Sequence, residues 1–181
     1  MKYLAGYAPS LLAQVQQRIE DGSLGALLQA RYPALHEVRT DRALYDYVNE
    51  LKAQFMRKAE PLSKVAYDNK LHVIRNALGT HTTISRTQGV KLKAKREIRI
   101  ASLFREVPPE WLRMIVVHEL AHMKERAHDK AFYALCAHME PAYHQFEFDL
   151  RLYLTHLEAG GASPWVELRH EGLASPSDTD D

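Results

Sequence analysis

The stretch Trp111-Leu-Arg-Met-Ile-Val-Val-His-Glu-Leu-Ala-His-Met123 determines how this chain must fold. It is almost wholly apolar and follows Pro108-Pro109, and proline suits the first turn of a helix. A helix that is apolar on nearly every face must be buried. We therefore expect a buried helix that carries two histidines and one glutamate into the protein interior.

The polar residues of this helix form an H-E-x-x-H pattern. His118 and His122 are separated by about 40° around a helix axis, so their imidazoles project side by side and can bind one Zn²⁺. Glu119 lies one residue further around the helix, where it can reach a metal-bound water. Burying these three groups without partners would cost several kcal/mol. The pattern predicts a metal site with His118 and His122 as ligands and Glu119 as the general base.

A catalytic zinc usually has three protein ligands and a water, so a third ligand must be found. His128 is the nearest downstream histidine, but on one continuous helix it would lie about 120° away from His122. Its role as a ligand therefore requires the helix to stop between Met123 and Ala127. His128 is the favoured third ligand, and the rivals are Glu125, Asp129, His138 and Glu140.

A second helix is expected directly after this corner. Asp129 is its predicted N-cap, the helix runs through Met139, and Pro141 ends it. The spacing from His118 through His128 equals the long metzincin pattern, but Glu125 stands where that pattern has a glycine. This departure argues against a metzincin proper.

Composition and charge limit the class of protein. The chain has 181 residues, 46% of them apolar, and a net charge of +1, so no strong field favours nucleic acid or a membrane surface. Its single cysteine, Cys136, excludes an internal disulfide and fits a reducing compartment. No apolar stretch is long enough for a membrane span, and the N-terminus lacks the apolar segment of a secretory signal. We expect a soluble cytoplasmic protein.

The rest of the chain predicts an α+β fold. Helical spacing of apolar residues indicates an N-terminal helical region, 1–62, whose helices run from Ser10 to Asp21-Gly22, over Leu24–Arg31, and from Thr40-Asp41 to before Pro61. A zincin-like metallohydrolase domain, 63–158, should contain a small antiparallel sheet packed on the active-site helix. Residues 159–181 are polar and rich in glycine, serine and proline, and are expected to form a disordered tail.

Short segments rich in β-branched residues supply the candidate strands: Lys64–Tyr67, Leu71–Ile74, Thr82–Ser85 and Glu97–Ala101. We expect Thr82–Arg86 and Arg96–Ser102 to pair as a hairpin or meander whose connection includes Gly89.

Residues 116–135, Val-Val-His-Glu-Leu-Ala-His-Met-Lys-Glu-Arg-Ala-His-Asp-Lys-Ala-Phe-Tyr-Ala-Leu, closely resemble the YgjP-like metal-dependent hydrolases, a group of small zincins related to the SprT-like proteases. The resemblance spans roughly Leu71 to Leu157. It implies a zincin-like fold, His118, His122 and His128 as ligands of one zinc ion, and Glu119 as the catalytic carboxylate. The family's usual Trp-Gly-Ser-Cys signature is absent, and Leu78–Arg86 occupies the corresponding strand.

The expected function is zinc-dependent hydrolysis. Zinc lowers the pKa of a bound water to about 7, and Glu119 can take the proton as the water attacks a carbonyl or phosphoryl centre. The leading hypothesis is a metallopeptidase that binds a peptide or protein strand along the sheet edge. The alternatives are a nucleotide or phosphoanhydride hydrolase at the same metal, an activity attached to the YgjP-like name, and a non-catalytic zinc-stabilised nucleic-acid-binding module.

Other polar and aromatic residues receive subsidiary roles. Candidate substrate contacts are Arg86, His81 and Tyr133, and the basic run Lys91, Lys93, Lys95 and Arg96 is interpreted mainly as a solvated hairpin. His138 and His144 are candidates to orient a ligand, and His36, His156 and His170 are interpreted as surface residues. Packing is the expected role of Cys136, Trp111, Phe132, Phe146 and Phe148.

Overall fold

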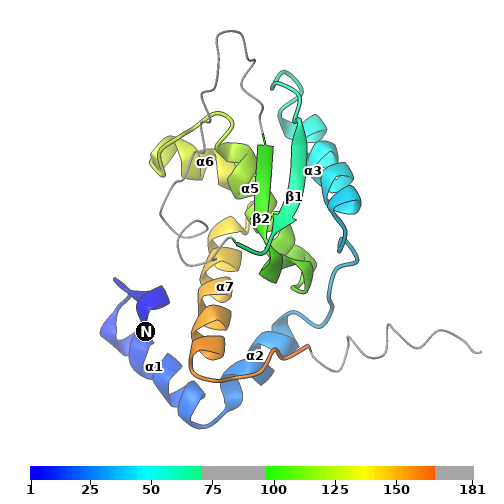
Figure 1. Ribbon diagram of the computed structural model, residues 1–181. Helices are drawn as coiled ribbons and strands as arrows, with labels where there is room; N and C mark the ends of the chain where they lie inside the picture. The colour runs from blue at the N-terminus through cyan, green and yellow to red at the C-terminus, as the bar shows by residue number, and fades with distance from the viewer. Residues whose placement is uncertain (71–96, 166–181) are drawn as a thin grey trace, which may run out of the picture. The chain divides into compact units, whose positions relative to one another are not determined.

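The computed structural model describes residues 1–70 and 97–165 of the chain. The helices and strands of these residues are, in chain order, the 3-10 helix η1 (Lys2–Leu4), α1 (Pro9–Glu20), α2 (Ser23–Arg31), α3 (Asp41–Phe55), β1 (Lys64–Asp68), β2 (Glu97–Ala101), the 3-10 helix η2 (Ser102–Arg105), α5 (Pro109–Ala121), α6 (Lys130–Met139) and α7 (Tyr143–Glu158) (Figure 1). The expected α+β class is confirmed. None of the helices in the described ranges is long and apolar enough to cross a membrane.

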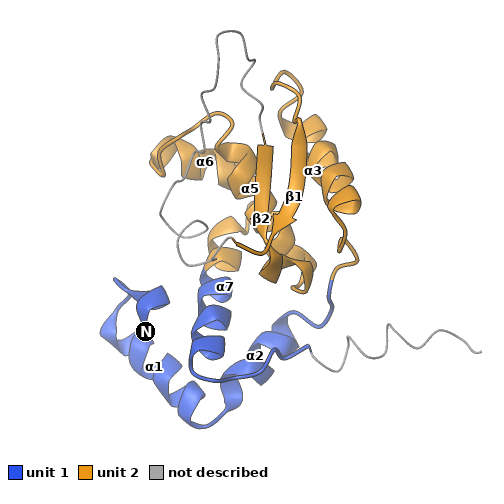
Figure 2. Ribbon diagram, viewed as in Figure 1, with its two compact units in different colours: residues 1–35, 148–181 blue, residues 36–147 orange. Residues whose placement is uncertain are grey.

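Contacts divide the chain into two compact units, one formed by residues 1–35 and 148–181 and the other by residues 36–147 (Figure 2). We call them unit 1 and unit 2. The whole of the predicted metal site lies in unit 2. The three segments expected from the sequence, 1–62, 63–158 and 159–181, remain a prediction.

Unit 1 contains a polar network around the buried carboxylate of Asp149. Arg31 donates to both carboxylate oxygens at 2.9 Å, and the hydroxyl of Tyr32 donates to one of them at 2.6 Å. Trp165 is fully buried, and its indole nitrogen donates to the carbonyl of Tyr32 at 2.7 Å. Trp165 belongs to the segment 159–181, which was expected to be a disordered tail, so the first part of that segment packs within unit 1. Residues 166–181 lie outside the described range.

The N-terminal helices lie close to their predicted positions. The first begins at Pro9, one residue before the expected start at Ser10, because proline suits the first helical position. Its end at Asp21-Gly22 is confirmed, and Gly22 has a positive φ of 73°. The start of α3 at Asp41 agrees with the predicted start near Thr40-Asp41, and the side chain of Thr40, its N-cap, accepts from the backbone N–H of Ala43.

In unit 2, β1 and β2 pair in parallel, with Lys64 opposite Glu97 and Asp68 opposite Ala101. The expected antiparallel sheet is therefore wrong for the described strands. Three consecutive residues of β1, Val65 to Tyr67, are buried, a pattern typical of parallel strands that are covered on both faces. The first strand, β1, contacts α3, and β2 contacts α5. The predicted strands Leu71–Ile74 and Thr82–Ser85, and the hairpin around Gly89, lie outside the described residues.

The expected buried helix is confirmed as α5. It begins at Pro109 and buries nine of its thirteen residues, including Trp111 and His118. His36 is hydrogen-bonded to the segment that leads into this helix. Its Nε2 lies 2.8 Å from the carbonyl oxygen of Phe104, and its backbone N–H donates to the carbonyl of Val107. His36 is only 7% exposed, so its interpretation as a surface residue is wrong.

Candidate metal centre

The predicted corner between the two histidine-bearing helices is confirmed. The first, α5, ends at Ala121, and α6 starts at Lys130. The backbone leaves the helix without glycine or proline through a tight turn in which the N–H groups of Lys124 and Glu125 both donate to the carbonyl of Ala121. Asp129 is the N-cap of α6, as expected, and its carboxylate accepts from two backbone N–H groups of that helix.

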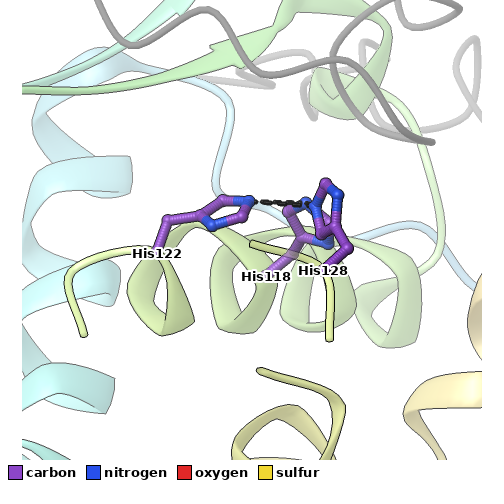
Figure 3. Close-up of side chains that lie close together, drawn as sticks. All are labelled: His118, His122 and His128. Carbon is purple, nitrogen blue, oxygen red and sulfur yellow. Dashed lines mark hydrogen bonds between the residues drawn. The ribbon is translucent and has the colours of Figure 1, made fainter. Parts of the chain in front are cut away.

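The corner brings three imidazoles together at their Nε2 atoms (Figure 3). The Nε2 of His118 lies 3.2 Å from that of His122 and 3.1 Å from that of His128, and the remaining pair is 3.1 Å apart. Tetrahedral zinc with nitrogen ligands at 2.0–2.1 Å separates two ligand atoms by about 3.3–3.4 Å. The observed triangle is therefore close to the spacing that one small cation requires, and these residues can hold a metal ion.

Hydrogen bonds at the opposite ring nitrogens orient two of these histidines. Nδ1 of His122 lies 3.0 Å from the carbonyl oxygen of Glu125. Because a carbonyl only accepts, Nδ1 must carry the proton, which leaves the lone pair of Nε2 for a metal. Nδ1 of His118 lies 2.7 Å from the hydroxyl of Tyr143, at the start of α7. Partners of this kind orient metal-binding histidines and set their tautomer.

An apolar side chain packs against the same three histidines. Phe132 of α6 is fully buried, and its ring centroid lies 4.9 Å from that of His118, 4.5 Å from that of His122 and 4.7 Å from that of His128. Phe132 therefore packs in the interior as predicted, and its ring contacts all three imidazoles. An apolar neighbour of this kind limits solvent access and strengthens electrostatic interactions at the site.

Glu119 follows His118 on α5 and is half-buried. Burial raises the pKa of this carboxyl group to about 7. A general acid or base is most effective when its pKa lies near the working pH, although a cation bound nearby would lower this value again. The catalytic role of Glu119 remains a prediction.

Each of the four rival ligands makes another contact in the structure. The backbone carbonyl of Glu125 supports His122, and the carboxylate of Asp129 caps α6. His138 is exposed and its ring contacts Phe55. Glu140 accepts from Arg113 at 2.6 Å. The geometry thus favours His128 as the third ligand over each of them.

Only some of the residues expected to contact the substrate or to orient a ligand lie near the three histidines. Tyr133 lies beside His128, with ring centroids 6.3 Å apart, and His144 is exposed beside Tyr133. The side chain that hydrogen-bonds to Nδ1 of His118 is Tyr143, a residue that the sequence did not reveal. A buried tyrosine needs a hydrogen-bond partner, but nothing in the local sequence shows that this tyrosine is buried.

Several other candidate residues lie outside the described range. These are the substrate contacts His81 and Arg86, the basic run at positions 91, 93, 95 and 96, and the surface residue His170.

A cluster of three histidines, drawn from the end of one helix and from the corner that follows it, with a glutamate inside that helix, is typical of metal-dependent hydrolases. Comparison with known proteins agrees. The profile of a family described as "YgjP-like, metallopeptidase domain" matches residues 66–153, which include the whole cluster. A UTP pyrophosphatase of Escherichia coli (strain K12) is 59% identical over 160 residues, which cover 88% of this chain and 96% of that protein. The chain belongs to the YgjP-like family, as its resemblance indicated. No solved structure matches it.

Proposed function

We propose that this protein hydrolyses a phosphoanhydride bond of UTP at one zinc ion held by His118, His122 and His128. The observation that carries this proposal is the 59% identity with a UTP pyrophosphatase along 96% of that relative. The convergence of the three Nε2 atoms within 3.2 Å of one another supports the metal part of it. The description of this relative as a UTP pyrophosphatase favours nucleotide hydrolysis over peptide hydrolysis, which was the leading hypothesis from the sequence.

The donor set fits a catalytic metal. Three neutral imidazoles leave room for a further ligand, which distinguishes catalytic zinc from closed structural sites. When bound, the metal acidifies water and stabilises negative charge that develops on a phosphoryl group. The protein holds it through the three histidines and orients His122 through the carbonyl of Glu125.

The reaction requires water to attack a phosphorus atom of the nucleotide. When water hydrolyses UTP at the α-phosphate, a bond forms between the water oxygen and the α-phosphorus, the bond from that phosphorus to the bridging oxygen breaks, and the products are UMP and pyrophosphate. Glu119 accepts a proton from the attacking water and passes it to the leaving pyrophosphate. Its half-buried position on α5, directly after His118, suits a carboxyl group that must take and return a proton.

A peptidase is the second candidate function, and one observation favours it. The family profile that matches residues 66–153 is described as a metallopeptidase domain. The H-E-x-x-H pattern on α5 serves peptide hydrolysis in many zinc enzymes. The same pair of groups, Glu119 and the metal, would then act on a carbonyl carbon in place of a phosphorus atom.

The test is a direct comparison of the two substrates. The purified protein is analysed for metal, stripped with a chelator and reloaded with zinc, and then incubated with UTP, with other nucleoside triphosphates and with a peptide library. We expect pyrophosphate release from UTP that disappears on stripping and returns with zinc. Peptide cleavage without pyrophosphate release would establish the peptidase instead, and a metal-loaded protein inactive on both would contradict the proposal.

A further inference from the structure

The hydrogen bond between His118 and Tyr143 can run in either direction, because a hydroxyl both donates and accepts. If Tyr143 donated to Nδ1, the proton of a neutral His118 would sit on Nε2, among the three converging nitrogens. A metal needs the lone pair of Nε2. Metal binding therefore requires that Nδ1 of His118 carries the proton and that the oxygen of Tyr143 accepts it across the observed 2.7 Å.

His122 does not have this ambiguity. Its Nδ1 faces the carbonyl oxygen of Glu125, and a carbonyl can only accept. Of these two histidines, His118 is the one whose tautomer depends on how a neighbouring side chain places its own proton.

The proton of the Tyr143 hydroxyl then needs another acceptor, because Tyr143 is fully buried. Cys136 is also fully buried and forms a side-chain hydrogen bond with Tyr143. It lies one helical turn after Phe132 on α6, the helix whose phenylalanine contacts all three imidazoles. Burial, followed by the negative charge of Glu147, raises the pKa of the Cys136 thiol to about 12. The sulfur is therefore a neutral thiol near neutral pH, and it can accept weakly from a hydroxyl.

The ring of Tyr143 also aligns the imidazole of His118. The two rings are stacked, with an interplanar angle of 16° and centroids 6.3 Å apart. Phe132 meets the same imidazole edge-on, with an interplanar angle of 75°. Contacts from α6 and α7 thus limit rotation of His118 about its side-chain bonds.

We propose that Tyr143 is a positioning residue that holds His118 in its metal-binding tautomer, accepting from Nδ1 while its own hydroxyl donates to Cys136. This inference rests on the metal site of the proposed function. It extends that site by one side chain from α7 and one from the middle of α6. The lone cysteine of the chain then has a role in the metal centre although it is not a ligand.

The test measures zinc affinity by chelator competition in three variants of the full chain. Tyr143→Phe keeps the ring and removes the acceptor, and we expect zinc affinity to fall by about 10–100-fold. Tyr67→Phe is the matched control, because it also removes the hydroxyl of a buried tyrosine in unit 2. That hydroxyl donates to the carbonyl of Val38 at 2.6 Å. Its zinc affinity should equal that of the parent. Cys136→Ala leaves the tyrosine in place but removes its acceptor, so we expect a smaller loss of zinc affinity.

A second measurement separates positioning from general loosening of the fold. Nitrogen-15 NMR of the zinc-loaded parent should show His118 protonated at Nδ1, and Tyr143→Phe should weaken or lose that signature while its circular dichroism stays unchanged. If Tyr143→Phe does not fold, Cys136→Ala decides, and parent-like affinity in it overturns the proposal. Equal affinity in Tyr143→Phe and the parent, or an equal loss in Tyr67→Phe, overturns it too. A parent that binds no zinc would contradict the proposed function itself.

Discussion

Arg113 of α5 and Glu140, which follows the last residue of α6, form an ion pair in which Nε lies 2.6 Å from the carboxylate. The same guanidinium donates to the carbonyl of Met139 at 3.0 Å. The start of one histidine-bearing helix is therefore tied to the end of the other. Because His118 and His128 lie on opposite sides of the corner, this link helps to set the distance between them.

We expect Arg113→Ala to lower the free energy of unfolding by about 2 kcal/mol, because it leaves a largely buried carboxylate without its partner. Urea unfolding followed by circular dichroism measures the change. Arg42→Ala is the matched control, since its pair with Asp46 is highly exposed and should contribute about 0.5 kcal/mol or less. Equal losses in the two variants would show that the link between the helices adds nothing specific.

The three-histidine cluster predicts how metal content responds to mutation. His128→Ala removes one of three converging nitrogens, and we expect most of the metal to be lost on dialysis. His138→Ala, on the exposed side of α6, should retain parental metal content. Metal analysis of both purified variants measures this difference. Equal retention in the two variants would remove His128 from the site.

The helix–corner–helix segment could be predicted because its signals are local. Pro109 marks the start of α5 and Asp129 caps α6, and both act within one helical turn. The separation of His122 and His128 then required a corner, since no straight helix brings the two imidazoles together. The residues that carry these signals are close neighbours in the chain.

What the sequence did not reveal depends on contacts between distant segments. The direction of β2 relative to β1 is a relationship between two strands that are far apart in the sequence, and the short apolar runs alone do not show it, although the unbroken run Val65–Tyr67 favours parallel pairing. Tyr143 meets His118 across 25 positions of sequence, and His36 meets Phe104 across 68. Burial of a polar side chain by a distant partner leaves no local pattern.

The buried His36 predicts a pH dependence of stability. Burial lowers the pKa of His36, and its two ring nitrogens are used by the carbonyl of Phe104 and the N–H of Val38, which suits the neutral ring. Because the unfolded chain binds the proton more tightly, this contribution to stability is fully present above the unfolded pKa of about 6.5 and is lost as the pH falls below it.

Unfolding by urea at pH 7.5 and at pH 5.5, with a chelator present throughout, measures this effect. The parent should lose more stability between the two pH values than His36→Gln, which has no titrating ring. The chelator keeps metal release from the other histidines out of the comparison. If the two proteins lost equal stability on acidification, His36 would have no part in the pH response.

The last prediction concerns the chemical step. Glu119→Gln keeps the size and burial of the side chain but cannot take a proton, so the variant should retain parental zinc and lose hydrolysis by about 10²–10⁴-fold. Glu110→Gln is a useful control, because it changes a glutamate of the same helix in its first turn, two turns before the cluster. Its hydrolysis rate and metal content should match those of the parent. Zinc analysis and substrate turnover on the same preparations separate binding from catalysis. A Glu119→Gln variant that binds zinc and hydrolyses as fast as the parent would mean that the proton is accepted elsewhere.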